Sequence, residues 1–317
     1  MKHKVVDFHC DALSKMQLDS NLAFDIEDHL DVTLQRMRQG GVALQTFAIF
    51  VSEKLGKPNF GHILDQIDIF QHKVVSTGVI PITSVEELEH AWISGTPGGL
   101  LSIEGADGLE GNLFYLETCF KRGVRFLGIT WNYGNWAADG ILEPRNGGLT
   151  PAGRKLVQSC YDLGITLDVS HLSEQGFWDL TELANEANKP FIASHSNVFD
   201  ICRHVRNLQE QQIQAIINID GLIGLTYVPW FVKNGDDSSS YDLLHHIERI
   251  CELGGQKHLM FGSDFDGIES HLTDLKHAGH YENWVNTLLK YYPEELVIGW
   301  ISGNALSFLK NTLPERR

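Results

Sequence analysis

Residues 164–196 read GITLDVSHLSEQGFWDLTELANEANKPFIASHS, and they contain two short apolar runs on either side of a helix-like segment. The runs, 164–171 and 190–196, are nearly continuous in their apolar character, as strands are when both of their faces are buried. The segment between them, 174–185, has a helix-like pattern. Near-continuous apolar strands that alternate with helices imply a parallel sheet that is covered by helices.

The same alternation continues along the chain, with eight apolar runs and helix-like segments between them. Start and stop signals accompany several helices: Pro151 follows Thr150 in a first turn, and Gly164 and Gly254 close two others. Eight units favour a closed (β/α)8 barrel over an open doubly wound sheet, and no glycine-rich dinucleotide-binding turn supports the open sheet. We therefore expect an α/β protein with a single (β/α)8 TIM-barrel domain over residues 1–317. The apolar runs are 5–11, 42–50, 99–105, 125–131, 164–171, 190–196, 221–228 and 258–267, and the helix-like segments are 59–75, 113–123, 150–164, 174–185, 207–220 and 240–255.

Composition and charge exclude several classes of protein. The 317 residues include 41 Asp and Glu against 25 Lys and Arg, which gives a formal net charge of −16. Hydrophobic residues make up 43% and charged residues 21%, a mixture typical of soluble globular chains and not of disordered ones. The negative charge repels phosphate backbones, so we expect no nucleic-acid partner. We expect no membrane partner either, because no apolar run approaches the ~20 residues of a spanning helix.

The cysteines and the N-terminal segment indicate a cytoplasmic protein. The five cysteines are odd in number, scattered and without CxxC spacing, which argues against a disulfide framework and against a cysteine-only zinc site. The segment MKHKVVDFHCDAL has no apolar signal core. We therefore expect a reducing, cytoplasmic setting.

Polar residues follow the apolar runs at the places where a barrel carries its chemistry, the C-terminal ends of its strands. Because side chains alternate along a strand, we expect His9 and Asp11 to point the same way while Cys10 faces the barrel wall as a small buried hydrophobe. Three polar stretches are expected to form loops on this face: 132–149, 233–240 and 268–281. The polar residues at the ends of the runs are His9, Asp11, Glu104, His171, His195, Asp264 and Asp266, and the fourth run ends in Trp131 and Asn132.

Each of these residues alone has an ordinary structural explanation. A single histidine at a strand end is more often a hydrogen-bonded core residue, and Glu104 could belong to an ion pair at the barrel rim. Three histidines and two carboxylates on one rim, however, are costly to bury without a cation, and they suit a borderline ion such as zinc. Five donors exceed one tetrahedral site and suit two ions that share a bridging carboxylate, for which Glu104 is the natural residue. The ligand types also admit cobalt or manganese.

The other candidates carry weaker signals. We expect Asp266 to be a loop hydrogen-bonding residue or a helix N-cap, and we expect His277 and His280 to face solvent. Tyr227, Trp230 and Phe231 could line a pocket or pack in the core. The remaining histidines without matching partners are His62, His72, His90, His204, His245, His246, His258 and His271.

A series of motifs covers nearly the whole chain in one order, and SIEG, DVSHLS, SHSN and GSDFDG are specific in combination although none is specific alone. In this order they resemble the zinc-dependent membrane (renal) dipeptidases and their bacterial cytoplasmic relatives. The matching stretches are DFHCDAL (7–13), LLSIEGADGL (100–109), FLGITWN (126–132), GGLTPAGRKLV (147–157), LDVSHLSE (167–174), PFIASHSN (190–197), RHVRNL (203–208), GSDFDG (262–267) and ISGNAL (301–306).

The resemblance implies a role for each matching residue. Arg206 corresponds to the arginine that holds the substrate's C-terminal carboxylate, and Asp264 to the aspartate that faces the metal centre and transfers protons. A (β/α)8 barrel of the metal-dependent amidohydrolase type, and often a homodimer, are also implied. The implied ligands of two zinc ions per chain are His9 and Asp11 for the first ion, Glu104 as the bridge, and His171 and His195 for the second.

One position departs from the family pattern. The family has a histidine at the end of the fourth strand that contacts the tetrahedral oxyanion, whereas this chain has Trp131 in the stretch GITWN. An indole offers one N–H donor and does not titrate. Asn132 follows, and strand alternation predicts that it faces away from the site.

We therefore expect a binuclear zinc metallodipeptidase that hydrolyses dipeptides, including L,D-dipeptides, by means of a hydroxide that bridges the metal ions. The alternative enzyme is a binuclear N-acyl amino-acid deacylase, or another amidohydrolase such as a lactonase, because one barrel hosts many chemistries. From a different class, a non-catalytic metal-binding protein on a decayed site stays open, with Trp131 as its only support.

Overall fold

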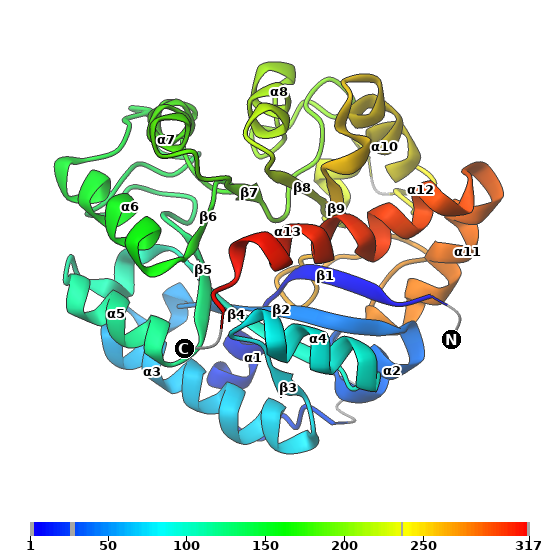
Figure 1. The fold of residues 1–317 in the computed structure, drawn as a ribbon, viewed down its shortest axis with the longest axis horizontal. Helices are drawn as coiled ribbons and strands as arrows, with labels where there is room; N and C mark the ends of the chain where they lie inside the picture. Colours follow the sequence, from blue (N-terminus) through cyan, green and yellow to red (C-terminus); the bar gives the residue numbers. More distant parts are fainter. Residues whose placement is uncertain (1–2, 26–28, 236, 316–317) are drawn as a thin grey trace.

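The computed structural model describes residues 3–25, 29–235 and 237–315, and in it eight parallel strands close into a barrel. Strand β1 pairs with β2 and β9, and β2 pairs with β4, which joins the two ends of the sheet (Figure 1). The predicted TIM barrel is confirmed, and each of the eight apolar runs overlaps one of its strands. The strands are β1 (Val5–Cys10), β2 (Val42–Phe50), β3 (Ile80–Pro81), β4 (Gly98–Glu104), β5 (Val124–Gly128), β6 (Thr166–Asp168), β7 (Ile192–Ala193), β8 (Leu222–Leu225) and β9 (Leu259–Phe261).

Strand β3 is an addition that the apolar pattern does not reveal. It has only two residues and pairs with the first residues of β4, outside the closed ring. One of the two is Pro81, which has no backbone N–H to donate and is therefore confined to positions of this kind.

Helices surround the strands, and each of the six predicted helix-like segments contains one. The expected signals act as predicted at α6: the Thr150 hydroxyl accepts a hydrogen bond from the Gly153 N–H, and Gly164 ends the helix in a left-handed conformation with φ 81°. The helices are α1 (Ala12–Leu18), α2 (Leu34–Gly40), α3 (Phe60–Ile69), α4 (Val85–Ser94), α5 (Leu113–Lys121), α6 (Pro151–Leu163), α7 (Glu174–Ala187), α8 (Glu210–Asn218), α9 (Pro229–Val232), α10 (Leu243–Glu252), α11 (Tyr281–Tyr291), α12 (Glu294–Ile298) and α13 (Asn304–Thr312).

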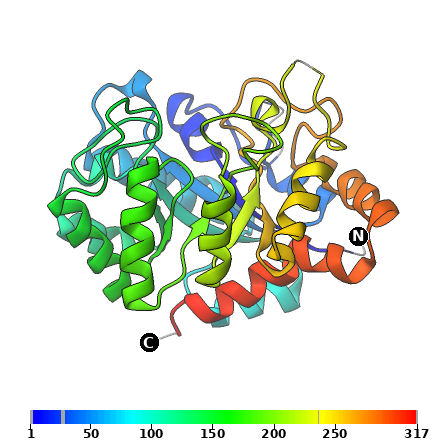
Figure 2. The ribbon, with the colours of Figure 1, turned by 90° about the horizontal axis from the view of Figure 1, so that it is seen from above.

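One end of the barrel is closed by α13 and the other carries the loops. Figure 2 shows α13 on one side of the strands and the connecting loops on the opposite side. An apolar cluster joins α13 and α4 to side chains from seven strands, so these side chains fill the barrel interior near the strand starts. The interior members from the strands are Val6, Phe8, Leu44, Leu100, Phe126, Ile192, Leu222 and Met260.

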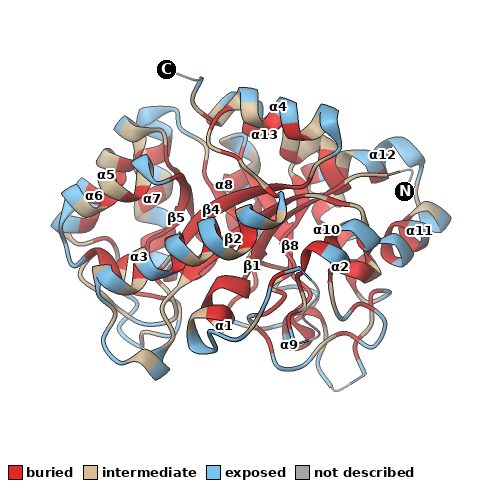
Figure 3. Cartoon of the chain, turned by 90° about the horizontal axis from the view of Figure 1, so that it is seen from below, coloured by how far each residue is buried: buried red, intermediate tan, exposed pale blue. Residues whose placement is uncertain are grey.

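Burial follows this arrangement, because the strands and the inner faces of the helices are buried while the outer faces are exposed (Figure 3). A second and larger apolar cluster lies between the strands and the helices. In the part of the chain that the structure describes, the helices are too short or too polar to cross a membrane.

Gly224 in β8 lies against the neighbouring strand end so closely that a side chain has no room. A Cβ added at Gly224 would overlap the backbone carbonyl oxygen of Ser194, the residue before His195. We expect Gly224→Ala to lower the free energy of unfolding by about 1–3 kcal/mol, as overpacked substitutions do. Gly128→Ala in β5 is the matched control, because its nearest heavy atom would be at 3.6 Å, an ordinary contact. Denaturant unfolding of both variants measures the effect, and equal losses would contradict the steric explanation.

Candidate active site

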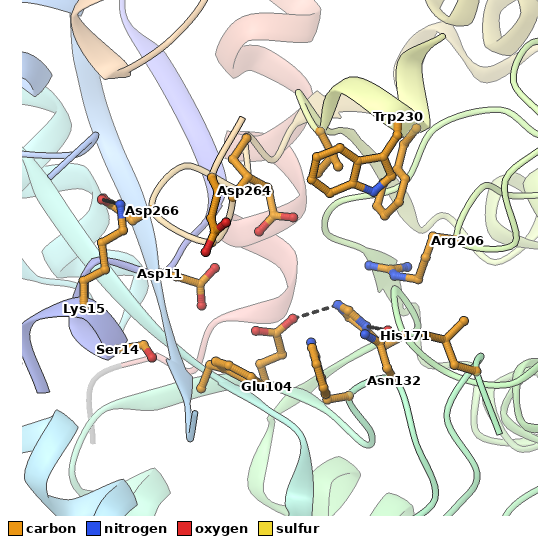
Figure 4. Close-up of a pocket in the computed structure, with 18 of the residues that line it drawn as sticks. Asp11, Ser14, Lys15, Glu104, Asn132, His171, Arg206, Trp230, Asp264 and Asp266 are labelled. Atoms are coloured by element: carbon orange, nitrogen blue, oxygen red, sulfur yellow. Dashed lines mark hydrogen bonds and ion pairs between the residues drawn. The ribbon is translucent and has the colours of Figure 1, made fainter. Parts of the chain in front are cut away.

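The predicted polar residues converge at the C-terminal ends of the strands. His9 lies in β1, and Asp11 is the first residue after this strand. Glu104 is the last residue of β4. The side chains of Asp11, Glu104 and Asp264 line a cavity of about 450 Å³. In Figure 4 their carboxylates lie around a common space, and His171 lies beside Glu104. The structure therefore brings together residues from the two halves of the chain.

Glu104 lies between the two groups of ligand candidates. Its Oε1 is 2.8 Å from His171 Nε2 and 3.5 Å from His195 Nε2, while its Oε2 is 3.7 Å from His9 Nε2. His9 Nε2 is also 3.3 Å from Asp11 Oδ2 and 3.7 Å from Asp264 Oδ1. The carboxylate of Glu104 therefore reaches one group with each oxygen, which is the geometry that a bridging ligand requires.

The donor set fits divalent cations. Two groups of described residues, His9 with Glu104 and His195, and His9 with Asp11 and Asp264, place their ligand atoms within 4.8 Å of one another. Both ring nitrogens of His9 and Oδ1 of Asp11 are buried and have no hydrogen-bond partner among the described residues. Buried polar atoms are nearly always paired, so these atoms indicate ligand positions. Nitrogen and carboxylate oxygen donors of this kind suit zinc and its neighbours.

Burial shapes the protonation of the cluster. It raises the pKa of Asp11 and Glu104, and it raises that of Asp264 to well above its usual range, where the nearby carboxylates add to the effect. At His9 burial opposes the charged form, but the carboxylates of Glu104, Asp11 and Asp264 outweigh it and raise the pKa to about 10. The three carboxylates and His9 thus favour their protonated forms, and a metal ion bound among them would replace these protons.

The other two histidines are neutral. Burial lowers the pKa of His171 and of His195 to well below the usual value, and the positive charges of Arg206 and His9 lower both further. A neutral imidazole is the form that binds a metal ion. His171 and His195 are thus prepared as ligands, and their Nε2 atoms are 2.9 Å apart.

Two buried aspartates hold the strand ends that carry these ligands. Asp7 in β1 accepts hydrogen bonds from the Ser263 N–H at 2.9 Å, from the Ser263 hydroxyl at 2.7 Å and from the His9 N–H at 3.2 Å. Asp168 in β6 likewise accepts from the N–H groups of Ser170 and Ser194, both at 3.0 Å. Sequence reasoning missed both aspartates, although each interrupts an apolar run two or three residues before a histidine.

Arg206 is a buried cation with unpaired donors. It is 5% exposed and lines the cavity, and its Nη1 and Nη2 atoms have no hydrogen-bond partner among the described residues. Its guanidinium lies 5.4 Å from the centre of the Phe231 ring, and burial lowers its pKa to about 10. Asn207 fixes the loop that carries it by donating to the carbonyls of Cys202 and Phe231. The arrangement can receive an anion at this side of the cavity.

The expectation that Asn132 faces away from the site is wrong. Strand β5 ends at Gly128, so strand alternation no longer governs residues 131 and 132. Asn132 lines the cavity, and its Oδ1 lies 2.9 Å from His171 Nδ1. Trp131 also lines the cavity, with its ring centre 5.1 Å from that of Phe50 and 6.2 Å from that of His171.

The structure also places the weaker candidates. Cys10 is buried, and Asp266 is a loop hydrogen-bonding residue that accepts from the N–H groups of Asp31 and Val32. His204, which the sequence left without a partner, lines the cavity, and its Nδ1 accepts from the Arg206 N–H. Trp230 and Phe231 line the cavity as well, whereas Tyr227 is fully buried among core aromatic rings.

Two of the three predicted loop stretches contribute to the cavity wall. The stretch 132–149 contributes Asn132 and Leu142 to the cavity wall, and 268–281 contributes Ile268 and Glu269. Among the described residues of 233–240, none lines this cavity.

Comparison with known proteins assigns the whole chain to one family. The family described as membrane dipeptidase (peptidase family M19) matches residues 1–315. Among individual relatives, an uncharacterized protein in the pqqA 5′ region of Klebsiella pneumoniae is 34% identical over 221 residues, which cover 66% of this chain and 80% of the relative. The dipeptidase aclJ of Aspergillus oryzae is 28% identical over 296 residues, which cover 88% of this chain and 69% of the relative.

A solved structure shows the same fold. The metallopeptidase from Rhodobacter sphaeroides, liganded with a phosphinate mimic of the dipeptide L-Ala-D-Ala, superposes with a TM-score of 0.89. The match covers 98% of this chain and 99% of the other at 23% sequence identity.

Proposed function

The chain belongs to the membrane dipeptidase family, peptidase family M19, and is a metal-dependent dipeptidase; from this premise we propose that it works with two zinc ions and accepts both L,L- and L,D-dipeptides. His9 and Asp11 would bind one ion, His171 and His195 the other, and Glu104 would bridge them. The observation that carries the proposal is the position of Glu104, whose Oε2 faces His9 while its Oε1 faces His171 and His195. When bound, two such ions polarise the scissile carbonyl and supply hydroxide from water near neutral pH.

Asp264 is proposed to move protons between the attacking water and the leaving nitrogen. It follows β9 with a φ of 67°, a strained conformation for a residue other than glycine, and this turns it toward the centre. Its burial raises the pKa, so the carboxyl group can hold a proton in the cavity and release it. It would accept the proton from water first and deliver it to the amine product afterwards.

Arg206 is proposed to bind the substrate's C-terminal carboxylate. Its unpaired Nη1 and Nη2 atoms can donate two parallel hydrogen bonds, the arrangement that recognises a carboxylate. This contact would fix the distance from the free carboxylate to the scissile bond and thereby limit the substrate to two residues. Trp131 would form part of the wall beside His171 and contribute a flat apolar surface with one N–H donor.

The proposal of L,D activity rests on the ligand of a relative. The Rhodobacter sphaeroides metallopeptidase with the same fold was solved with a mimic of L-Ala-D-Ala. The cavity of this chain lies at the strand ends, with Arg206 beside Trp230 (Figure 4). On that ground we propose that this chain also cleaves dipeptides with a C-terminal D-residue.

The experiment that tests the function measures amino-acid release by the zinc-loaded protein from L,L- and L,D-dipeptides, with N-acetylated dipeptides alongside. We expect free dipeptides to be cleaved, the activity to disappear with a chelator, and zinc to restore it, because the ions supply the nucleophile. Cleavage of acylated compounds alone would show an N-acyl amino-acid deacylase instead. No cleavage of any compound, with two ions bound, would mean that the site takes a different substrate.

Replacing Arg206 should affect substrate binding more than turnover. A single hydrogen bond to a charged group contributes about 1.5–3 kcal/mol, and Arg206 is proposed to donate two, so we expect Arg206→Ala to raise KM by at least roughly 10- to 100-fold with a smaller change in kcat. Arg203→Ala is the matched control, because Arg203 lies three residues away and is exposed. A dipeptide whose C-terminus is an amide should be an equally poor substrate for the unmodified enzyme and for Arg206→Ala. A KM unchanged by Arg206→Ala would exclude this residue from the substrate-binding site.

Replacing Asp264 should stop the chemical step. Asp264→Asn keeps the size of the side chain but cannot take up a proton, so we expect kcat to fall by about 10²–10⁴-fold. Metal analysis of the same preparation is the control and should still find the zinc content of the unmodified protein. An active Asp264→Asn enzyme would exclude the proton-transfer role.

A further inference from the structure

The Nδ1 atoms of the three histidines proposed as metal ligands, His9, His171 and His195, have different environments. His171 Nδ1 is 2.9 Å from Asn132 Oδ1, and His195 Nδ1 is 2.7 Å from Ser194 Oγ. His9 Nδ1, by contrast, is buried without a hydrogen-bond partner among the described residues. Contacts at Nδ1 matter because a neutral imidazole carries one proton, and the partner of one nitrogen decides which nitrogen keeps a free lone pair.

Asp168 determines the direction of the hydrogen bonds at His195. Its Oδ1 accepts from three donors: the Ser170 N–H, the Ser170 hydroxyl at 2.7 Å and the Ser194 N–H. Its Oδ2 accepts from the hydroxyl of Ser194. A carboxylate oxygen only accepts, so the single proton of the Ser194 hydroxyl points to Asp168.

The Ser194 oxygen can therefore only accept a hydrogen bond from His195. The proton that it accepts is the one on Nδ1, so Nε2 keeps its lone pair and faces Glu104 at 3.5 Å. Asn132 acts in the same sense at His171, because its Oδ1 is an acceptor and Nε2 of that ring lies 2.8 Å from Glu104.

We propose that Asp168 with Ser194, and Asn132, are positioning residues that fix the tautomers of His195 and His171, so that Nε2 of each ring is the metal-binding atom. This inference rests on the proposed two-ion site and concerns its second ion. Partners of this kind orient a ligand and raise its basicity, and their loss typically lowers metal affinity by about 10- to 100-fold.

Asp168→Asn tests the direction in which the Ser194 hydroxyl donates its proton, because Asn has almost the same side-chain shape as Asp. The three donors at the δ1 position require an acceptor, so the amide oxygen takes that place and the amide NH2 faces Ser194. Ser194 then accepts from the amide, and its own proton is free to point to His195 Nδ1 at 2.7 Å, a shorter contact than that with Ser170 Oγ at 3.2 Å. The ring proton moves to Nε2, where it blocks the lone pair that binds the ion.

The experiment titrates metal-free protein with zinc in competition with a chromophoric chelator, and with cobalt while its visible absorption is recorded. We expect Asp168→Asn and Ser194→Ala to weaken one of the two binding steps by about 10- to 100-fold and to change the cobalt spectrum of that site. Ser170→Ala is the matched control: it removes a hydroxyl from the same Asp168, and the Ser170 Oγ contacts Ser194 Oγ and the backbone N–H of His195 but no imidazole nitrogen in the described structure. We expect its zinc affinities to stay within about threefold of those of the unmodified protein.

The outcomes separate this inference from the proposed function. If the unmodified protein binds only one ion, the two-ion proposal fails, while the comparison of variants still decides the role of Asp168 at the site that contains His195. Wild-type affinities in folded Asp168→Asn and Ser194→Ala proteins would overturn the inference, as would an equal loss in Ser170→Ala. Circular dichroism and thermal unfolding establish the folded state, and Ser194→Ala decides alone if Asp168→Asn does not fold.

Discussion

The free-energy cost of burying charge at the ends of the barrel strands is the constraint on which the rest of the structure depends. Unpaired charges inside a protein are expensive, and the strand ends bring together three carboxylates and three imidazoles, those of Asp11, Glu104, Asp264, His9, His171 and His195. The protein contains two kinds of buried carboxylate in this region. Asp168 has both oxygens satisfied by N–H and hydroxyl donors, whereas Asp11 leaves one oxygen without a partner. The first kind supports the structure, and we propose that the second kind binds a cation.

The scaffold holds this cluster by close backbone contacts as much as by side chains. Cβ atoms added at Gly224 in β8 or at Gly262 after β9 would both overlap the same carbonyl oxygen, that of Ser194. Neighbouring strand ends thus enclose the backbone directly before His195, while the Ser194 side chain contacts the ring. A small displacement of either strand would move the imidazole, and metal ligands tolerate little displacement. The barrel therefore supplies rigidity at the place where the chemistry needs it.

The sequence allowed most of the fold and the central residues to be predicted, and the failures have physical reasons. Periodicity reveals β1 and the other barrel strands because each is buried on both faces, and the ligand candidates follow because strand ends share one rim. Asn132 was misplaced because β5 ends at Gly128, and alternation has no meaning beyond a strand end. Asp168 was missed because a buried aspartate reveals its partners only in three dimensions. His204 was missed because the loop that brings it to Arg206 has no periodic pattern.

The charge of the chain poses a last question, since a protein of net charge −16 has to accept a substrate that carries a carboxylate. Screening limits surface charges to a range of about 8–10 Å, so the residues around the cavity decide the local potential. Without metal, five carboxylates line the cavity against three cations, Arg206, Lys15 and Lys54, and those carboxylates that are ionised would repel a substrate carboxylate. The two proposed ions would add four positive charges to those of Arg206, Lys15 and Lys54, which then outnumber the carboxylates of Asp11, Glu104, Asp264, Asp266 and Glu269. Metal loading would thus reverse the sign of the cavity, so the ions would serve the binding of the dipeptide as well as its hydrolysis.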